Sequence, residues 1–299
     1  MADDKKGWRM TTVTSSGPRR RLLGQVARLH PRRVHRSAAR RLFERRIARR
    51  ARTLESQDLV ALGSAYGGWT VPADSITEDW ICYCVGAGSD VSFDLALIET
   101  FGCRVWCLDP GEDAERLVLG AATREPRLSF SRVALAVTDG VVRMFLAADP
   151  QSSSLSAENL QHGSATVDVP GRSLPGLMAE NGHTRVDLLK LDIEGAEYSV
   201  LESLDLAALG VRVLCVELHQ TVATERALGL LDRLQRQGFV AVSRSGADYT
   251  FLRAAPLQSE SRTRTPARGA GAFAVGSAGA ASVWCGSIIE VVCTAGVTL

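Results

Sequence analysis

The sequence contains no uninterrupted apolar run of about 20 residues, the length that a membrane-spanning helix requires. It also has no apolar signal-peptide core near its start, because arginine interrupts each candidate stretch. Seven cysteines are present, but no pair has the two-knuckle spacing of a zinc site. Their odd number and apolar surroundings indicate small buried side chains in a reducing compartment. We therefore expect a soluble, cytoplasmic protein without a structural metal site.

Acidic residues are scarce at the N-terminus. Residues 1–52 contain 17 lysines and arginines against three acids, a net charge of about +14. Since the whole chain carries +2, the other 247 residues carry about −12. With 45% hydrophobic residues, the chain can bury one large core plus appendages. The sequence thus predicts a basic arm on an acidic body.

The basic arm, residues 1–58, has the pattern of an amphipathic helix. Apolar residues recur mostly at steps of three and four between Leu22 and Ile47, and Pro31 is expected to break the helix. Such an arm suits an anionic membrane, a nucleic acid, or the acidic body of its own or a neighbouring subunit. A solvated helix that only keeps the protein in solution is the simpler alternative. A transit peptide is disfavoured by two early aspartates and few serines.

Strand-like and helix-like segments alternate over residues 59–254. Strands are predicted at 80–86, 104–110, 186–193 and 211–219, and helices at 92–102, 196–209 and 224–238. A hairpin is predicted at Asp139-Gly140, and a closing hairpin at 239–253. This order is typical of an α/β fold with a largely parallel sheet that is covered on both faces. Residues 255–299, rich in Ala, Gly, Ser and Thr, are predicted to be a tail outside this domain.

The segment CVGAGSD, residues 84–90, lies between a predicted strand and a predicted helix. Gly86 and Gly88 allow the backbone to approach a ligand closely, and the helix that follows offers unpaired N–H groups. The third glycine of a dinucleotide fingerprint is absent, and Asp90 stands near its place. A carboxylate there would repel a pyrophosphate but tolerates a ligand with a positive centre. A structural turn without a ligand is the alternative.

Asp109 follows the next predicted strand, 21 residues after Gly88. An acid at about this distance can accept hydrogen bonds from ribose hydroxyls. The spacing suits NAD and S-adenosylmethionine equally, so it predicts a nucleoside pocket without naming the rest of the cofactor. A helix cap is less favoured, because Pro110 and Gly111 follow at once.

The segment KLDIEGAE, residues 190–197, places three carboxylates at the end of an apolar run. On a strand, Asp192 and Glu194 would share a face, and Gly195 would then release the chain into a helix. Glu197 falls in the first turn of that helix, where the helix dipole alone can explain an acid. Burying Asp192 and Glu194 costs several kcal/mol unless they are paired, so we expect both to face a cleft.

The segment VELHQ, residues 216–220, ends a strand that is expected to neighbour Asp192. A single histidine is more often structural than catalytic, yet this position makes His219 a candidate general base beside Asp192 and Glu194. Asp192 and neighbouring acids could hold a divalent ion, but no third ligand can be named, so no metal site is predicted.

The stretch VDLLKLDIEGAEYSVLESL, residues 186–204, resembles the signature of the FkbM-type methyltransferases, and residues 80–253 follow that family's order of elements, in its methyltransferase-like branch. The resemblance implies the class I methyltransferase fold, a Rossmann-like, doubly wound and mostly parallel seven-stranded sheet with a C-terminal antiparallel hairpin. It also implies S-adenosylmethionine as the cofactor. Two departures from the family pattern are Cys84, where an aspartate usually precedes the first glycine, and Asp90, where a later glycine is usual.

The function implied by the resemblance is methyl transfer to a hydroxyl of a sugar or another small metabolite. The cofactor would lie over Gly86 and Gly88, beside Asp90, with its ribose on Asp109. Asp192, Glu194 and His219 would then be candidates for taking the acceptor's proton, and the segments 66–72 and 152–154 for lining the acceptor.

Two alternatives to a methyltransferase stay open. An NAD(P)-dependent oxidoreductase would share the glycine turn and Asp109, but the full fingerprint and a hydride-transfer set are missing. A non-catalytic interaction protein of the same fold would act through its basic arm, by binding an anionic surface or by self-association.

Overall fold

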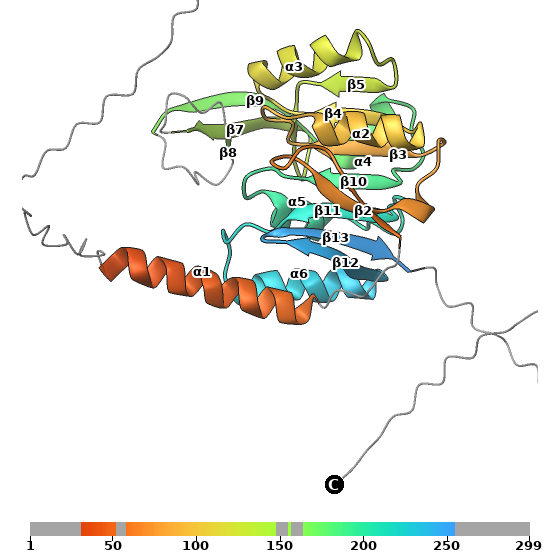
Figure 1. Ribbon diagram of the computed structural model, residues 1–299. Helices are drawn as coiled ribbons and strands as arrows, with labels where there is room; N and C mark the ends of the chain where they lie inside the picture. The colour runs from red at the N-terminus through yellow and green to blue at the C-terminus, as the bar shows by residue number, and fades with distance from the viewer. Residues whose placement is uncertain (1–30, 52–57, 148–154, 157–163, 255–299) are drawn as a thin grey trace, which may run out of the picture. The chain divides into compact units, whose positions relative to one another are not determined.

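The computed structural model describes residues 31–51, 58–147, 155–156 and 164–254 of the 299-residue chain, without the side chains of residues 31–39. Its centre is a seven-stranded sheet (Figure 1). The strand order is β12 (Phe239–Ser245), β13 (Asp248–Arg253), β11 (Val213–Glu217), β10 (Leu188–Leu191), β3 (Ile81–Val85), β4 (Arg104–Leu108) and β5 (Leu128–Ser131). β13 is antiparallel to both of its neighbours, and the other pairs are parallel.

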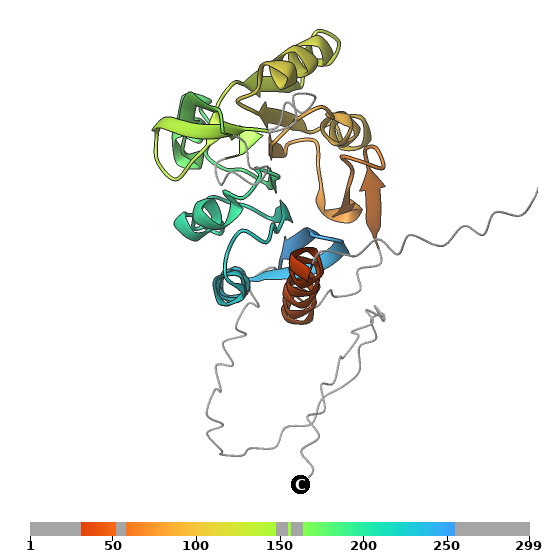
Figure 2. The same ribbon diagram turned by 90° about the vertical axis from the view of Figure 1, so that its left-hand side faces the viewer.

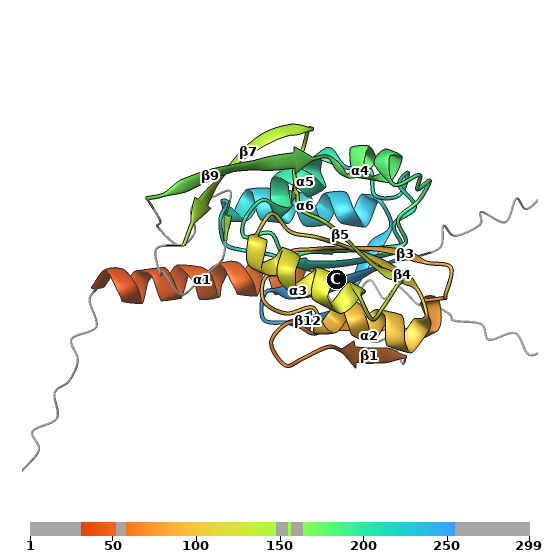
Figure 3. The ribbon, with the colours of Figure 1, turned by 90° about the horizontal axis from the view of Figure 1, so that it is seen from above.

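Helices cover both faces of this sheet. One face carries α2 (Ser92–Phe101) and α3 (Glu112–Ala122), and the other carries α4 (Leu174–Glu180), α5 (Glu197–Ser203) and α6 (Thr224–Arg236) (Figure 3). The side chains of β3 alternate between the two cores, with Cys82 and Cys84 on the α2 side and Tyr83 and Val85 on the α4 side. Burial on both faces explains why these strands are apolar throughout. The predicted fold class is confirmed, including the closing hairpin β12–β13.

The structure differs from the prediction in one helix boundary and in one additional hairpin. The helix predicted at 196–209 is shorter, since α5 ends at Ser203. A hairpin that the sequence pattern did not indicate precedes the central sheet and consists of β1 (Leu59–Leu62) and β2 (Trp69–Pro72), followed by the short 3-10 helix η1 (Ala73–Ser75). The hydroxyl of Thr250 donates to the carbonyl of Thr70 at 2.7 Å and so ties this hairpin to β13.

A second, four-stranded sheet has the order β6 (Ala134–Leu135), β9 (Thr166–Arg172), β7 (Gly140–Leu146) and β8 (Leu155–Ser156). The hairpin predicted at Asp139-Gly140 is wrong, because β9 lies between β6 and β7. Asp139 Oδ1 accepts hydrogen bonds from the backbone N–H and the hydroxyl of Ser173, at 2.7 and 2.8 Å. These bonds hold Ser173, which follows β9, beside the turn. β9 therefore pairs with β6 and β7 in place of a direct pairing between those two strands.

The helix α1 (Pro31–Arg50) begins at the proline where the sequence predicts a break, and it runs alongside α6 (Figures 1 and 2). Phe43 and Ile47 are buried in the same core as α6. Arg46 pairs with Glu225 at 3.3 Å, and Arg50 pairs with Asp232. The described part of the arm thus packs on the acidic body of its own chain.

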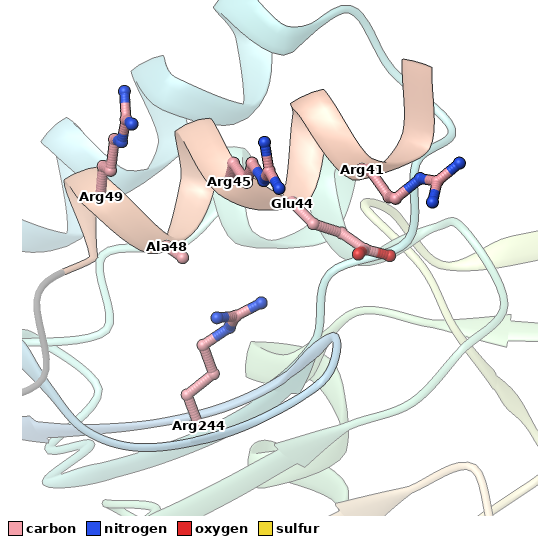
Figure 4. Close-up of a pocket in the computed structure, with 6 residues that line it drawn as sticks. All are labelled: Arg41, Glu44, Arg45, Ala48, Arg49 and Arg244. Atoms are coloured by element: carbon pink, nitrogen blue, oxygen red, sulfur yellow. The ribbon is translucent and has the colours of Figure 1, made fainter. Parts of the chain in front are cut away.

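The opposite side of α1 borders a groove of about 420 Å³. Figure 4 shows its arginines, which are Arg41, Arg45 and Arg49 from α1 and Arg244 from β12. Among the helices that the structure describes, none is long and apolar enough to cross a membrane. The predicted tail, 255–299, and the loop 152–154 lie outside the described residues.

Candidate active site

A cavity of about 980 Å³ lies at the carboxyl ends of β3, β4, β10 and β11. In parallel α/β sheets this edge is where ligands bind. Its lining includes all seven residues that the sequence singles out: Gly86, Gly88, Asp90, Asp109, Asp192, Glu194 and His219. The structure therefore brings them into one space. The segment 66–69, expected on the acceptor side, lines the same cavity.

The glycine turn follows β3 directly. Gly86 has φ +85°, and a β-carbon there would lie 1.8 Å from the carbonyl oxygen of Asp192. Gly88 has φ +51° but faces open space. Only a glycine fits at residue 86, because both the backbone angle and the carbonyl of Asp192 exclude a side chain. The turn thus presents bare backbone to the cavity.

Asp109 holds this turn in place. Its Oδ2 accepts hydrogen bonds from the N–H groups of Ala87 and Gly88, each at 3.0 Å, and its Oδ1 accepts from Gly111 at 2.7 Å. Sequence spacing predicts a ribose contact for this residue and does not foresee the turn contacts. Oδ1 accepts only one hydrogen bond and keeps a second lone pair, so a ribose hydroxyl could still donate to it.

Asp90 also makes structural bonds beside the cavity. One oxygen accepts from the hydroxyl of Ser64, and the other accepts from the N–H of Ser92 at 2.7 Å. Burial raises the pKa of Asp90, but these hydrogen bonds outweigh it and hold the pKa below its usual value. Asp90 therefore connects the β1–β2 loop to the start of α2, and its predicted cofactor contact stays a prediction.

Lys190 is a buried cation that the sequence analysis does not identify. Its Nζ donates to the carbonyl oxygen of Gly86 at 2.5 Å and lies 3.8 Å from Oδ2 of Asp192. Burial lowers the pKa of Lys190, but the carboxylates of Asp192 and Asp94 raise it above its usual value. Lys190 thus links the glycine turn to Asp192, which follows its own strand.

Asp192 and Glu194 do not lie on a strand as expected. β10 ends at Leu191, and Glu194 adopts φ +54°, a left-handed conformation. Their side chains nevertheless both line the cavity. The strand ends early because the chain must turn at Gly195 to enter α5, so the two-residue period no longer decides which way these acids point.

Glu197 is more than the helix-start acid that the sequence suggests. Its side chain is 0% exposed, and it accepts hydrogen bonds from the N–H groups of Ile193 and Gly195 at 3.1 and 2.9 Å. Its Oε1 also lies 3.1 Å from Nδ1 of His219. A buried carboxylate on Nδ1 fixes the orientation of the imidazole and leaves Nε2 directed at the other acids. The helix dipole alone does not explain this residue.

The other ring nitrogen of His219 faces two acids. Nε2 lies 3.5 Å from Glu217 and 3.7 Å from Glu194. Burial lowers the pKa of His219, but the hydrogen bond to Glu197 and the charges of Glu197, Glu217 and Glu194 raise it to about 9. At pH 7 His219 is therefore an imidazolium.

Glu217 and Asp248 complete the acidic cluster, and neither was predicted as a site residue. Burial and the carboxylate of Asp192 raise the pKa of Glu217 to about 8, although His219 opposes this shift. The same two causes raise the pKa of Asp248 to about 6. Asp248 escapes sequence analysis because it begins an antiparallel strand, β13, at the edge where the parallel strands end.

Asp192, Glu217 and His219 each offer a ligand atom within 4.8 Å of the others, a spacing that a divalent cation could bridge. The third ligand that the sequence analysis could not name would thus come from the strand β11 and the residues just after it.

Residues 102–241 match the methyltransferase FkbM domain. The chain is also 41% identical over 80 residues to the AMB antimetabolite synthetase AmbE of Pseudomonas aeruginosa, a match that spans 25% of this chain and 4% of that protein.

The chain is also similar to three solved structures over part of its length. Precorrin-6y C5,15-methyltransferase from Geobacter metallireducens is 10% identical, with a TM-score of 0.35 over 61% of this chain and 84% of that one. The Methanococcus jannaschii fibrillarin pre-rRNA processing protein is 12% identical, with a TM-score of 0.36 over 67% and 85%. TrmK of M. capricolum, in complex with the cofactor product S-adenosylhomocysteine, is 9% identical, with a TM-score of 0.33 over 60% and 65%.

The family match covers three of the four strands at whose carboxyl ends the cavity lies, β4, β10 and β11, and includes Asp109, Asp192, Glu194 and His219. The strand order observed in the chain itself is that of the class I methyltransferase sheet. Residues 102–241 thus match the methyltransferase FkbM domain, and the resemblance found in the sequence is confirmed over this range.

Proposed function

We propose that this protein is an S-adenosylmethionine-dependent methyltransferase that methylates a hydroxyl of a sugar or another small metabolite. The observation that carries the proposal is a single cavity that joins the glycine turn and Asp109 to the acidic cluster around His219. The match to an antimetabolite synthetase supports an acceptor among small metabolites.

The residues at the glycine turn fit a cationic cofactor. Around the turn the cavity is lined by the acids Asp90, Asp94, Asp109, Glu112 and Asp113. The nearby Arg132 is already paired with Glu112 at 2.9 Å and Glu115 at 3.3 Å. Such surroundings repel the pyrophosphate of NAD and attract a sulfonium. The cofactor would lie over the backbone of Gly86 and Gly88, and Asp109 would accept hydrogen bonds from its ribose.

When bound, S-adenosylmethionine would supply the methyl group from its positively charged sulfur, and S-adenosylhomocysteine would be the leaving product. The chain's own residues position the acceptor hydroxyl and take its proton. Holding two reactants in line can supply roughly 7–11 kcal/mol of the barrier. As the new O–C bond forms, the hydroxyl proton moves to Nε2 of His219, and Glu197 stabilises the resulting imidazolium through Nδ1.

His219 must be neutral to act as this base. Its pKa of about 9 means that the neutral form predominates only above that pH. A cation bound among these acids lowers the pKa of an imidazolium beside it, because the two positive charges repel. His219 is therefore expected to lose its proton more readily in the loaded enzyme. Asp192 and Glu194 are the other candidate bases.

We expect kcat/KM for S-adenosylmethionine to rise about tenfold per pH unit on the acid side and to level off near pH 9. The free enzyme's kcat/KM reports the pKa of its essential base, and a base with a raised pKa is inactive below that value. In Glu197→Gln the carboxylate that raises the pKa of His219 is gone. The rising part of the pH profile should therefore move to lower pH by about one unit or more. Rates measured between pH 6 and 10 test this, and a rising part that stays in place in Glu197→Gln would argue against His219.

Calorimetry with S-adenosylmethionine, S-adenosylhomocysteine and NAD separates the proposal from an oxidoreductase. We expect binding of the first two and none of NAD. Asp109→Ala should weaken S-adenosylhomocysteine binding about tenfold or more, because charge-assisted hydrogen bonds are lost. Glu99→Ala removes an exposed acid from α2, outside the cavity, and should change nothing. Tight binding of NAD without binding of S-adenosylmethionine or S-adenosylhomocysteine would refute the methyltransferase proposal.

The acceptor itself requires a screen. Transfer of labelled methyl groups to glycosides and other hydroxylated metabolites, analysed by mass spectrometry, identifies both the acceptor and the methylated atom. A product methylated on nitrogen or carbon would contradict the proposed hydroxyl acceptor while leaving the cofactor proposal intact.

A further inference from the structure

The second sheet forms an apolar wall of the cavity. Six side chains of its strands line the space: Val142, Met144 and Leu146 from β7, Leu155 from β8, and Val167 and Val169 from β9. They are direct cross-strand neighbours, since Val142 pairs with Val169, Met144 with Val167, and Leu146 with Leu155. Residues two apart share a face of a strand, so this is one continuous apolar surface.

The outward face of the same strands is different. Arg143 and Asp168 form a two-bond ion pair there, at 2.8 and 3.0 Å. The alternation orients the sheet with its apolar face toward the cavity. Within the described part of the chain this face is only partly covered, because Leu146 and Val167 remain 39% and 37% exposed.

The charged groups of the same cavity lie away from this apolar wall. The glycine turn and Asp109 lie at one end, and the cluster of Asp192, Glu217, His219 and Asp248 lies at the carboxyl ends of β10 and β11. This contrast favours a substrate with both polar and apolar parts. A wholly polar substrate would leave the apolar wall hydrated, whereas a hydrocarbon surface would displace that water.

We infer that the acceptor is a small amphiphile, whose hydroxyl faces the acidic cluster while an alkyl or alicyclic body lies on the apolar wall of β7, β8 and β9. This inference rests on the proposed function and narrows its substrate class. A free sugar or a multiply charged metabolite does not fit the wall, since neither offers it apolar surface.

A series of n-alkyl β-D-glucosides from methyl to octyl, and of n-alkanols from butanol to octanol, tests the wall directly. Calorimetry on the full chain saturated with S-adenosylhomocysteine, below micelle-forming concentrations, gives each Kd. For fully buried chains the affinity rises about fourfold per methylene. We expect at least about a 30-fold gain from the methyl to the hexyl glucoside.

The variant pair on β7 and β9 is Leu146→Asp with Val167→Asp, and it should reduce that gain to below about threefold. Both side chains are partly exposed, so the double variant is expected to fold, which circular dichroism checks. The matched control is Val141→Asp, the same change on the same strand at a residue that is 74% exposed and outside the cavity lining. It should keep the full gain.

Two results would overturn the inference: Kd values that do not fall with chain length in either series, or an equal loss of the gain in Val141→Asp. Failure of S-adenosylhomocysteine to bind would overturn the proposed function instead. In that case the two series without it still decide whether the wall binds hydrocarbon.

Discussion

His219→Gln is expected to lower kcat for methyl transfer about 10²–10⁴-fold, the usual contribution of a general base. Glutamine approximates the shape of the side chain but cannot take up a proton at the position of Nε2. Binding of S-adenosylhomocysteine should change less than about twofold, because the glycine turn and Asp109 are untouched. The measurements are single-turnover methyl transfer and calorimetry on the same preparation.

The matched control is His183→Gln. His183 contacts the hydroxyl of Tyr83 at 2.8 Å and lies outside the cavity lining, so its loss should leave the transfer rate within about twofold. Asp192→Asn and Glu194→Gln test the rival bases. A His219→Gln enzyme that retains most of its rate, while one of these carboxylate variants loses it, would assign the proton to that carboxylate.

Gly86→Ala should lower the free energy of unfolding by about 2–6 kcal/mol and abolish cofactor binding. A left-handed backbone costs a residue with a side chain about 1–3 kcal/mol. The added β-carbon would also lie 1.8 Å from the carbonyl of Asp192, and relieving such a clash costs about 1–3 kcal/mol. Relief requires β3 and the chain after β10 to separate, which opens the floor of the cavity. Urea unfolding and calorimetry measure the two effects.

Two further glycine variants separate these causes. Gly88→Ala has the strained angle but open space, so a loss of about 1–2 kcal/mol is expected. Gly229→Ala, in the exposed interior of α6, has neither penalty and should stabilise the protein by about 0.5–1 kcal/mol. Equal effects of all three substitutions would refute the close approach of Asp192 to the turn.

The parts of the fold that follow from local pattern were predictable. Apolar strands that end in glycine or aspartate indicate a parallel sheet, because its strands are buried on both faces and its loops gather at one edge. The same reasoning placed Gly86, Asp109 and Asp192 together, and the structure confirms that they line one cavity. The local pattern did not predict which strands pair when more than one partner was available. The Asp139-Gly140 turn has the residues of a hairpin, yet Asp139 binds Ser173 and β9 becomes the partner of both strands.

The sequence by itself determined the doubly wound sheet, the glycine turn and the acids at its edge, since period, glycine and strand length are properties of neighbouring residues. Only the tertiary structure decided that Glu197 pairs with His219, that Lys190 joins Asp192 to Gly86, and that β7 and β9 turn their apolar face to the cavity. The physical reason is distance along the chain. Glu197 and His219 are 22 residues apart on different elements, and a buried hydrogen bond between them exists only after α5 and β11 have packed together.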